Sequence, residues 1–239
     1  HFATRNLDEQ GNWKNLMEQK NSSADISPTA GQMPRLLGLA LASKVYREHP
    51  ELNKIEAFKK FTNSGNEVAF GTIGDASTSE GPFWETINAA GVLQVPMVMS
   101  VWDDGYGISV PKEFQTAKGS ISTALSGMQR SDAEAGLQLY KVKGWDYAGL
   151  CEAFEEGIQL AREQHIPVLF HVEELTQPQG HSTSGSHERY KTPVRLEWER
   201  NWDGLVKMKE WLLSNGLADE TELEKIQTEA KEEAKLARD

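Results

Sequence analysis

Short apolar runs alternate with longer amphipathic stretches between residues 26 and 175. Continuous apolar runs predict buried strands, and they lie at residues 67–75, 96–104, 137–145 and 167–175. Stretches with helical spacing lie before and between them, at residues 26–49, 81–94 and 147–165. Residues 113–136 have a weaker pattern, which predicts a short helix with a loop. This alternation is typical of an α/β domain with a mostly parallel sheet and helices on both faces.

The composition changes after residue 175. Residues 176–193 are rich in Gly, Ser and Pro and poor in apolar side chains, which predicts a surface loop. Residues 194–239 predict a tail of two helices, separated where Asn215-Gly216 ends the first and Asp219 caps the second. We therefore expect residues 1–175 to form one α/β domain, followed by the loop and the helical tail.

The charge balance limits the partners of the chain. Acidic residues outnumber basic ones by 36 to 25, and the formal net charge of the 239 residues is -11. A nucleic-acid partner is therefore not expected. The longest apolar run, LLGLALA, is far shorter than a membrane span, and the N-terminal residues have no signal-peptide pattern. We expect an intracellular protein without membrane segments, in the cytoplasm or, in a eukaryote, in the mitochondrial matrix.

Several residues of reactive types have simple structural interpretations. Cys151 is the only cysteine, which excludes a disulfide within the chain and a cysteine-based metal cage. Its position in the helix predicted at 147–165 indicates a packed thiol. His171 lies in an apolar run and is expected to be a hydrogen-bonded core residue. The histidines expected at the surface are His49, His165 and His187.

Two aspartates follow predicted strands. Asp75 and Asp104 should enter the same crevice, because ligands of parallel α/β sheets gather at the carboxyl ends of the strands. Gly74 and Gly81 bracket the connection to the next helix, where backbone N–H groups favour an anion. A divalent cation reconciles the carboxylates with this anion, since carboxylate and phosphate oxygens are ligands that Mg²⁺ prefers. The residues therefore predict a metal-bridged diphosphate site.

The spacing of these motifs resembles a known signature. Thiamine diphosphate enzymes carry Gly-Asp-Gly followed further along by Asn-Asn, and GDASTSEG and WDDGYGIS match that arrangement here. The segments ISPTAGQMPRLLGLALASK, SEGPFWETINAAGVLQVP, GHSTSGSHERYK and NWDGLVKMKEWLLSNGLADETEL resemble one branch of these enzymes. That branch is the alpha region of the decarboxylating component of 2-oxo acid dehydrogenase complexes, of the pyruvate and branched-chain type. The resemblance covers nearly the whole chain and implies a thiamine diphosphate-binding fold.

The resemblance implies roles for individual positions. The implied magnesium ligands are Asp75, Asp104 and the carbonyl of Tyr106. The implied cofactor-binding positions, besides these aspartates, are Gly74, Ala76 and Ser77 in the diphosphate-facing turn, Ser27 and Thr29 near the thiamine, and Ile108 packed on the cofactor. His181 matches the loop histidine near the reacting centre and is the candidate catalytic residue. Ser182 and Ser184 lie in the region that mitochondrial relatives phosphorylate, although a Ser/Thr-rich loop alone does not predict regulation.

Some positions depart from the pattern of this family. Ala76 replaces a glycine, so the turn either has ordinary φ values or is strained. Asp103-Asp104 replaces Asn-Asn, which keeps oxygen ligands and adds negative charge beside a diphosphate. Gln177 lies where relatives often have arginine. Anchoring of the phosphate is therefore not expected to be identical to that of the family.

The implied activity is oxidative decarboxylation of a 2-oxo acid, with transfer of the acyl unit to a lipoyl group on the acyltransferase component. A beta subunit or region of the same component is expected to hold the other half of the cofactor, in an assembly of the alpha2beta2 type. We expect the chain to be a fragment of the alpha region and to be inactive alone. The sequence leaves open which 2-oxo acid is used and whether the beta region is fused or separate.

Other interpretations remain open on the sequence alone. Asp75 can simply cap a helix, Asp103-Asp104-Gly105 can form a plain turn, and His181 can be a solvated surface residue. Two alternative functions are a transketolase-like thiamine diphosphate enzyme and a non-catalytic scaffold subunit with a degenerate cofactor site. The loop GHSTSGSHERY argues against the first, and only Ala76 and Asp104 hint at the second.

Overall fold

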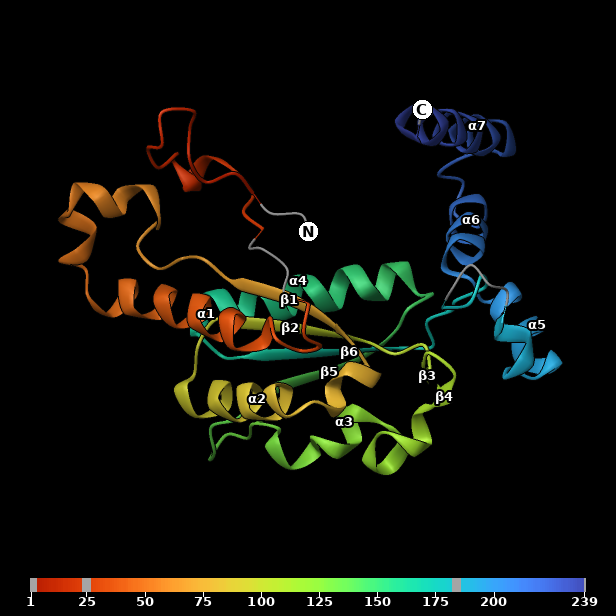
Figure 1. The fold of residues 1–239 in the computed structure, drawn as a ribbon, viewed down its shortest axis with the longest axis horizontal. Coiled ribbons are helices and arrows are strands. Elements are labelled where there is room, and N and C mark those ends of the chain that lie inside the picture. The colour runs from red at the N-terminus through yellow and green to blue at the C-terminus, as the bar shows by residue number, and fades with distance from the viewer. Residues whose placement is uncertain (1–3, 23–26, 182–185, 239) are drawn as a thin grey trace.

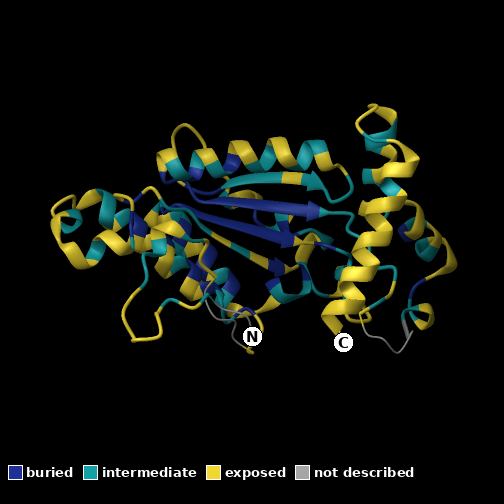
Figure 2. Ribbon diagram, turned by 90° about the horizontal axis from the view of Figure 1, so that it is seen from above, coloured by how far each residue is buried: buried dark blue, intermediate teal, exposed yellow. Residues whose placement is uncertain are grey.

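Four parallel strands form the centre of the computed structural model, which describes residues 4–22, 27–181 and 186–238 (Figure 1). The sheet order is β1-β2-β6-β5, with bounds Ala69–Gly74 for β1, Met97–Trp102 for β2, Gln138–Lys143 for β5 and Val168–Glu173 for β6. All four predicted strands are therefore confirmed. The central strands β2 and β6 are buried along almost their whole length, as expected for strands covered on both faces (Figure 2).

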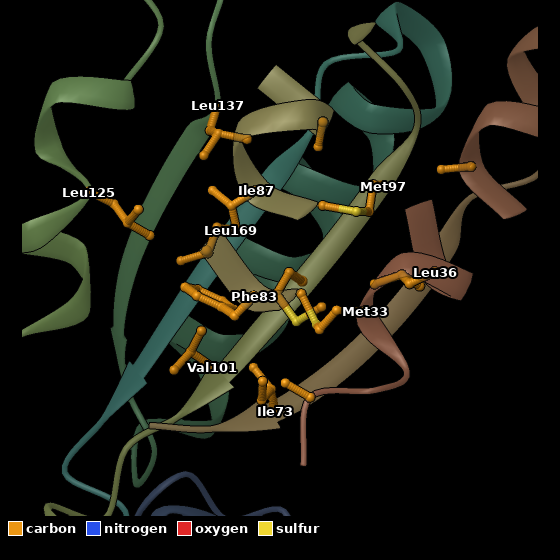
Figure 3. Close-up of a cluster of buried hydrophobic side chains, with 14 of the residues drawn as sticks. Met33, Leu36, Ile73, Phe83, Ile87, Met97, Val101, Leu125, Leu137 and Leu169 are labelled. Atoms are coloured by element: carbon orange, nitrogen blue, oxygen red, sulfur yellow. The ribbon is translucent and has the colours of Figure 1, made fainter. Parts of the chain in front are cut away.

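Helices cover both faces of the sheet, as predicted. Their bounds are Met33–Glu48 for α1, Gly81–Leu93 for α2, Ile121–Ala124 for α3 and Tyr147–Gln164 for α4. Side chains of α1, α2 and α3 join Met97, Met99 and Val101 of β2 in the larger core cluster, part of which is drawn in Figure 3. Val98 points to the opposite face, where it packs with residues of β6 and α4 in a second cluster. This separation follows from the alternation of side chains along a strand.

Helix α4 approaches the sheet closely at Gly157, which predicts a measurable packing effect. A Cβ atom at this position would lie 2.5 Å from Cζ of Phe170 and 3.1 Å from Tyr140 and Val168. We expect Gly157→Ala to lower the free energy of unfolding by about 1–3 kcal/mol through overpacking. Gly91→Ala in α2 is the control, since a Cβ there meets nothing within 4 Å, and it should stabilise by up to about 1 kcal/mol. Chemical denaturation of both variants tests this, and equal effects would contradict the packing argument.

The C-terminal part has three helices instead of the two that were predicted: α5 (Pro193–Asn201), α6 (Gly204–Ser214) and α7 (Glu220–Arg238). The additional break occurs at Asp203, whose carboxylate accepts a hydrogen bond from the N–H of Leu205 and caps α6. The predicted break between α6 and α7 is confirmed. Gly216 has φ 64°, and Asp219 and Glu222 exchange hydrogen bonds as a capping pair.

Two smaller expectations are wrong, those for Cys151 and His165, and one residue of the predicted surface loop is buried. Lys191 lies in the predicted surface loop but is 4% exposed, because its ammonium is neutralised by a buried carboxylate described below. Cys151 is exposed on α4, since Gly157 and Ala161 occupy the buried side of that helix. His165 is buried at the end of α4, where it has a left-handed conformation.

No helix in the described part of the chain is long and apolar enough to cross a membrane.

Candidate cofactor site

The carboxyl ends of β1 and β2 lie side by side. Gly74 and Trp102 are register partners, and the N–H of Asp75 donates to the carbonyl of Trp102 (3.0 Å). Asp75 therefore follows β1 at the same edge of the sheet where Asp103 and Asp104 follow β2. This arrangement confirms that the aspartate motifs meet at one edge of the sheet.

Asp75 is buried and forms no ion pair with another described residue. The residue is 5% exposed, and Oδ2 has no hydrogen-bond partner among the described residues. Burial, together with the negative charges of Asp103 and Asp104, raises the pKa of Asp75 to about 7. A buried, unpaired carboxylate oxygen is costly, so this position fits a ligand that brings positive charge.

The turn after Asp75 has ordinary backbone geometry. Ala76–Ser79 form a short 3₁₀ helix, and Ala76 is not among the residues with positive φ. The strained alternative for Ala76 is therefore excluded, and the backbone does not require glycine at this position. Gly107 makes room for this alanine, since a Cβ there would lie 2.8 Å from that of Ala76. Helix α2 follows directly, with Gly81 and Pro82 in its first turn.

A cleft of about 310 Å³ lies beside this turn. It brings together four of the predicted cofactor-binding residues, which are Ser27, Thr29, Gly74 and Ser77. Trp102, Gln32 and Thr72 contribute further lining. The predicted residues Asp75, Ala76, Asp104, Tyr106, Ile108 and His181 are not among the described residues that line it. His181 is exposed, and Ser182 and Ser184 lie outside the described residues.

Asp103 is neutralised by its neighbours. Its Oδ2 accepts hydrogen bonds from Nζ of Lys112 (2.7 Å) and Nε2 of His171 (2.9 Å), and its Oδ1 accepts from the N–H of Gly105 (2.9 Å). Burial raises the pKa of Asp103, but the hydrogen bonds from His171 and Lys112 outweigh it and leave the pKa below its ordinary value. His171 also lies 2.8 Å from Oγ of Ser122 through Nδ1. The prediction of a hydrogen-bonded core histidine is confirmed.

Asp104 lies beside a different set of groups. Its Oδ1 accepts a hydrogen bond from the N–H of Tyr106 (3.1 Å). Burial raises the pKa of Asp104, while this hydrogen bond and the charge of Lys191 act against the rise. The described residues contain no cluster of three or more His, Cys, Asp or Glu side chains arranged to hold a metal ion. A metal at Asp75 and Asp104 therefore needs backbone carbonyl and ligand oxygens to complete its coordination.

The segment after Asp104 is held in an unusual conformation. Tyr106–Gly107 form the short strand β3, which pairs with β4 (Val110–Pro111). Ile108, between them, is 62% exposed and has φ 59°. A β-branched residue is rarely found with positive φ, and strain of this kind gathers at functional sites.

Comparison with known proteins identifies the family. Residues 2–238 match the family model described as dehydrogenase E1 component. The chain belongs to this family. It is 35% identical over 173 residues to the pyruvate dehydrogenase E1 component subunit alpha of Bacillus subtilis, covering 71% of this chain and 44% of that protein.

Two further relatives of this chain are also described as pyruvate dehydrogenase E1 component subunit alpha. The Staphylococcus aureus protein is 30% identical over 184 residues, covering 76% of this chain and 47% of that protein. The Rickettsia bellii protein is 24% identical over 183 residues, covering 76% of this chain and 53% of that protein. The chain thus spans about half the length of the curated relatives that it matches. The family predicted from the aspartate motifs and the neighbouring segments is confirmed.

Three residues around the two aspartate turns were not predicted from the sequence. Lys112 neutralises Asp103, and Nη2 of Arg195 donates to the backbone carbonyl of Asp104 (2.7 Å). Glu199 is fully buried and binds Arg195. A glutamate on a helix with Arg at i−4 is an ordinary surface pair, so the sequence carried no signal of its burial.

Proposed function

We propose that this chain forms the metal- and diphosphate-binding half of a thiamine diphosphate site in the E1 component of a 2-oxo acid dehydrogenase complex. The observation that carries the proposal is the buried carboxylate of Asp75. Its carboxylate is buried, one oxygen has no partner among the described residues, and its pKa is raised to about 7 by burial and by the neighbouring aspartates. A bound cation supplies the missing partner.

The charges at the two turns support a divalent ion. Asp103 is already balanced by Lys112, which leaves Asp75 and Asp104 as two carboxylates for one Mg²⁺. The backbone carbonyl of Tyr106 adds a neutral oxygen of the type that Mg²⁺ binds, and oxygens of the diphosphate complete the shell. The donor set therefore fits a magnesium ion that bridges the protein and a diphosphate.

The other predicted residues would hold the cofactor around this ion. Gly74, Ala76 and Ser77 would face the diphosphate at the start of α2, where backbone N–H groups favour an anion. Ser27 and Thr29, which line the same cleft, would approach the thiamine, and Ile108 would pack on it. When bound, the cofactor supplies the electron sink for decarboxylation. His181 would donate or accept a proton near the reacting atoms.

The partners follow from the relatives, which are alpha subunits. We propose a beta subunit or region that completes the cofactor site, an alpha2beta2-type assembly, and a lipoyl-bearing acyltransferase component that accepts the acyl group. The substrate is a 2-oxo acid, either pyruvate or a branched-chain acid. The isolated chain is expected to be inactive. The family match argues against a transketolase-like enzyme, and the ordinary backbone of Ala76 removes one of the two hints of a degenerate scaffold.

An activity assay tests the proposal. The complete E1 assembly is supplied with thiamine diphosphate, Mg²⁺ and an artificial electron acceptor, and oxidation of pyruvate and of branched-chain 2-oxo acids is followed. We expect turnover of at least one of these acids, which ceases when EDTA removes the metal. An assembly that binds the cofactor but oxidises none of them would contradict the assigned reaction.

A further inference from the structure

Helix α5 is attached to the turn that carries Asp104. Nη2 of Arg195 donates to the backbone carbonyl of Asp104 across 91 residues of sequence (2.7 Å). The other end of the same peptide group is also fixed, because the N–H of Gly105 donates to Oδ1 of Asp103 (2.9 Å). Gly105 has φ 84°. The orientation of the 104–105 peptide is thus set from two sides, by α5 and by the buried aspartate.

Arg195 is itself held by a buried ion pair. Its Nε donates to Oε1 of Glu199 (2.8 Å), and Nζ of Lys191 lies 2.8 and 3.0 Å from the two carboxylate oxygens. The side chains of Lys191 and Glu199 are 0% and 1% exposed, whereas that of Arg195 is 28% exposed. A fully buried pair of this kind has little freedom to move, so it fixes the position of the guanidinium.

Aromatic rings complete the contact between α5 and the turn. The guanidinium of Arg195 lies 4.6 Å from the ring centre of Trp198 and 5.6 Å from that of Tyr106. Lys191 lies 5.1 Å from the ring centre of Tyr106, within the range of a cation–π contact. The side chain of Tyr106 is therefore contacted by Arg195, which also binds the carbonyl of Asp104, and by Lys191. Figure 1 shows α5 at the end of the sheet where the β3–β4 hairpin lies.

We propose that Arg195 is a positioning residue for the metal site, which orients the backbone from Asp104 to Tyr106 for coordination. This inference rests on the proposed function, because it needs a metal ion at the turn of Asp104. Arg195 itself is assigned no contact with the metal. Since the hydrogen bond from Arg195 joins the turn to α5, binding at the turn and docking of α5 stabilise each other, as linkage requires. The planar guanidinium is essential to this role, because a lysine ammonium does not reproduce its geometry.

The experiment compares Arg195→Lys and Arg195→Gln with Arg200→Gln in the complete E1 assembly. Arg200 lies on the same helix and is exposed, so its variant removes one charge without touching the turn. Mg²⁺ is titrated calorimetrically at saturating thiamine diphosphate. We expect both Arg195 variants to bind Mg²⁺ at least about tenfold more weakly, the range for loss of one charged hydrogen bond, and Arg200→Gln to match the wild type.

The direction of the change in Mg²⁺ affinity distinguishes a positioning role of Arg195 from an effect of its charge alone. Removing a positive charge near a bound Mg²⁺ lowers the Coulomb repulsion between them and strengthens binding, whereas loss of positioning weakens it. Tighter binding by Arg195→Gln, or wild-type binding by Arg195→Lys, would overturn the positioning role. If the wild-type assembly binds no Mg²⁺ in the presence of thiamine diphosphate, the proposed function itself would be overturned.

Hydrogen exchange gives a second readout that is independent of activity. Adding Mg²⁺ and thiamine diphosphate should slow exchange of the amides in α5 in the wild type and in Arg200→Gln, and should have a smaller effect in both Arg195 variants. Equal protection of α5 in all four proteins would contradict the coupling between the helix and the turn.

Discussion

Replacing Asp75 with asparagine is expected to weaken binding of Mg²⁺ and thiamine diphosphate to the complete assembly by at least about 100-fold, since loss of an outer-shell partner already costs 10–100-fold. Asparagine keeps the size of the side chain but removes its charge. Asp132→Asn is a matched control, because Asp132 is exposed in a loop. Calorimetric titration measures the loss. An affinity for the Asp75 variant equal to that of the control would remove Asp75 from the site.

The same variant should have a different effect on stability when metal and cofactor are absent. The pKa of Asp75 is raised from 3.8 to about 7, so the folded state binds this proton more tightly than the unfolded state does. The contribution of Asp75 to stability therefore falls as the pH rises from about 4 to about 7 and is constant above that range. Asp75→Asn removes this dependence and should be more stable than wild type at pH 8 by on the order of 2–4 kcal/mol.

Denaturation of wild type and Asp75→Asn in EDTA, as a function of pH, measures this difference. The neighbouring Asp103 has a lowered pKa and acts in the opposite direction, so the comparison between the two proteins isolates Asp75. A difference that grows as the pH falls below 4, or that is absent at pH 8, would contradict the burial of an unpaired carboxylate.

The second large effect concerns the buried ion pair behind the turn. Glu199→Gln leaves the ammonium of Lys191, which is 0% exposed, without its charged partner. We expect a loss of about 3–5 kcal/mol of folding free energy and a melting temperature lower by about 10 °C. Glu197→Gln is the control, because Glu197 lies on the exposed side of the same helix.

A double variant distinguishes the ion pair from general sensitivity of α5. Lys191→Met combined with Glu199→Leu removes both charges and should recover most of the stability, since apolar replacements of a buried pair are often neutral or better. Thermal unfolding of the complete protein followed by calorimetry provides the measurement. A change below about 1 kcal/mol for Glu199→Gln would show that Lys191 finds solvent or another partner.

The sequence predicted the parts of the fold that depend on local pattern. The apolar run Met97–Trp102 is typical of a strand that is covered on both faces, as β2 is. The strand, and the position of Asp104 just after its end, could therefore be predicted from the sequence alone. The meeting of Asp75 with Asp103 and Asp104 followed from the rule that parallel strands end at one edge. Neither inference needed a contact between distant side chains.

The residues that were missed depend on such contacts. Arg195 meets Asp104 across 91 residues, and no local pattern distinguishes it from the exposed Arg200 on the same helix. Glu199 looks like a surface glutamate because its burial is compensated by Lys191 from the preceding loop. The geometry of Ala76 was equally undecided, because φ depends on how the turn packs against Gly107.

Other errors had signals that the sequence contained. Asp203-Gly204 after Trp202 is an N-cap followed by a flexible residue, and it marked the additional helix start. In α4, small residues at Gly157 and Ala161 are four positions apart and define the face against the sheet. Cys151 is not in phase with them, so its exposure could have been read from the same spacing.

The most direct test of the account is calorimetric titration of thiamine diphosphate into the complete wild-type assembly, first with Mg²⁺ and then with EDTA. We predict saturable binding that depends on the metal, because Asp75 and Asp104 need a cation before they can share a crevice with a diphosphate. A correctly folded assembly that shows no binding in Mg²⁺, or binds equally well in EDTA, would contradict a metal-bridged cofactor site at these two turns.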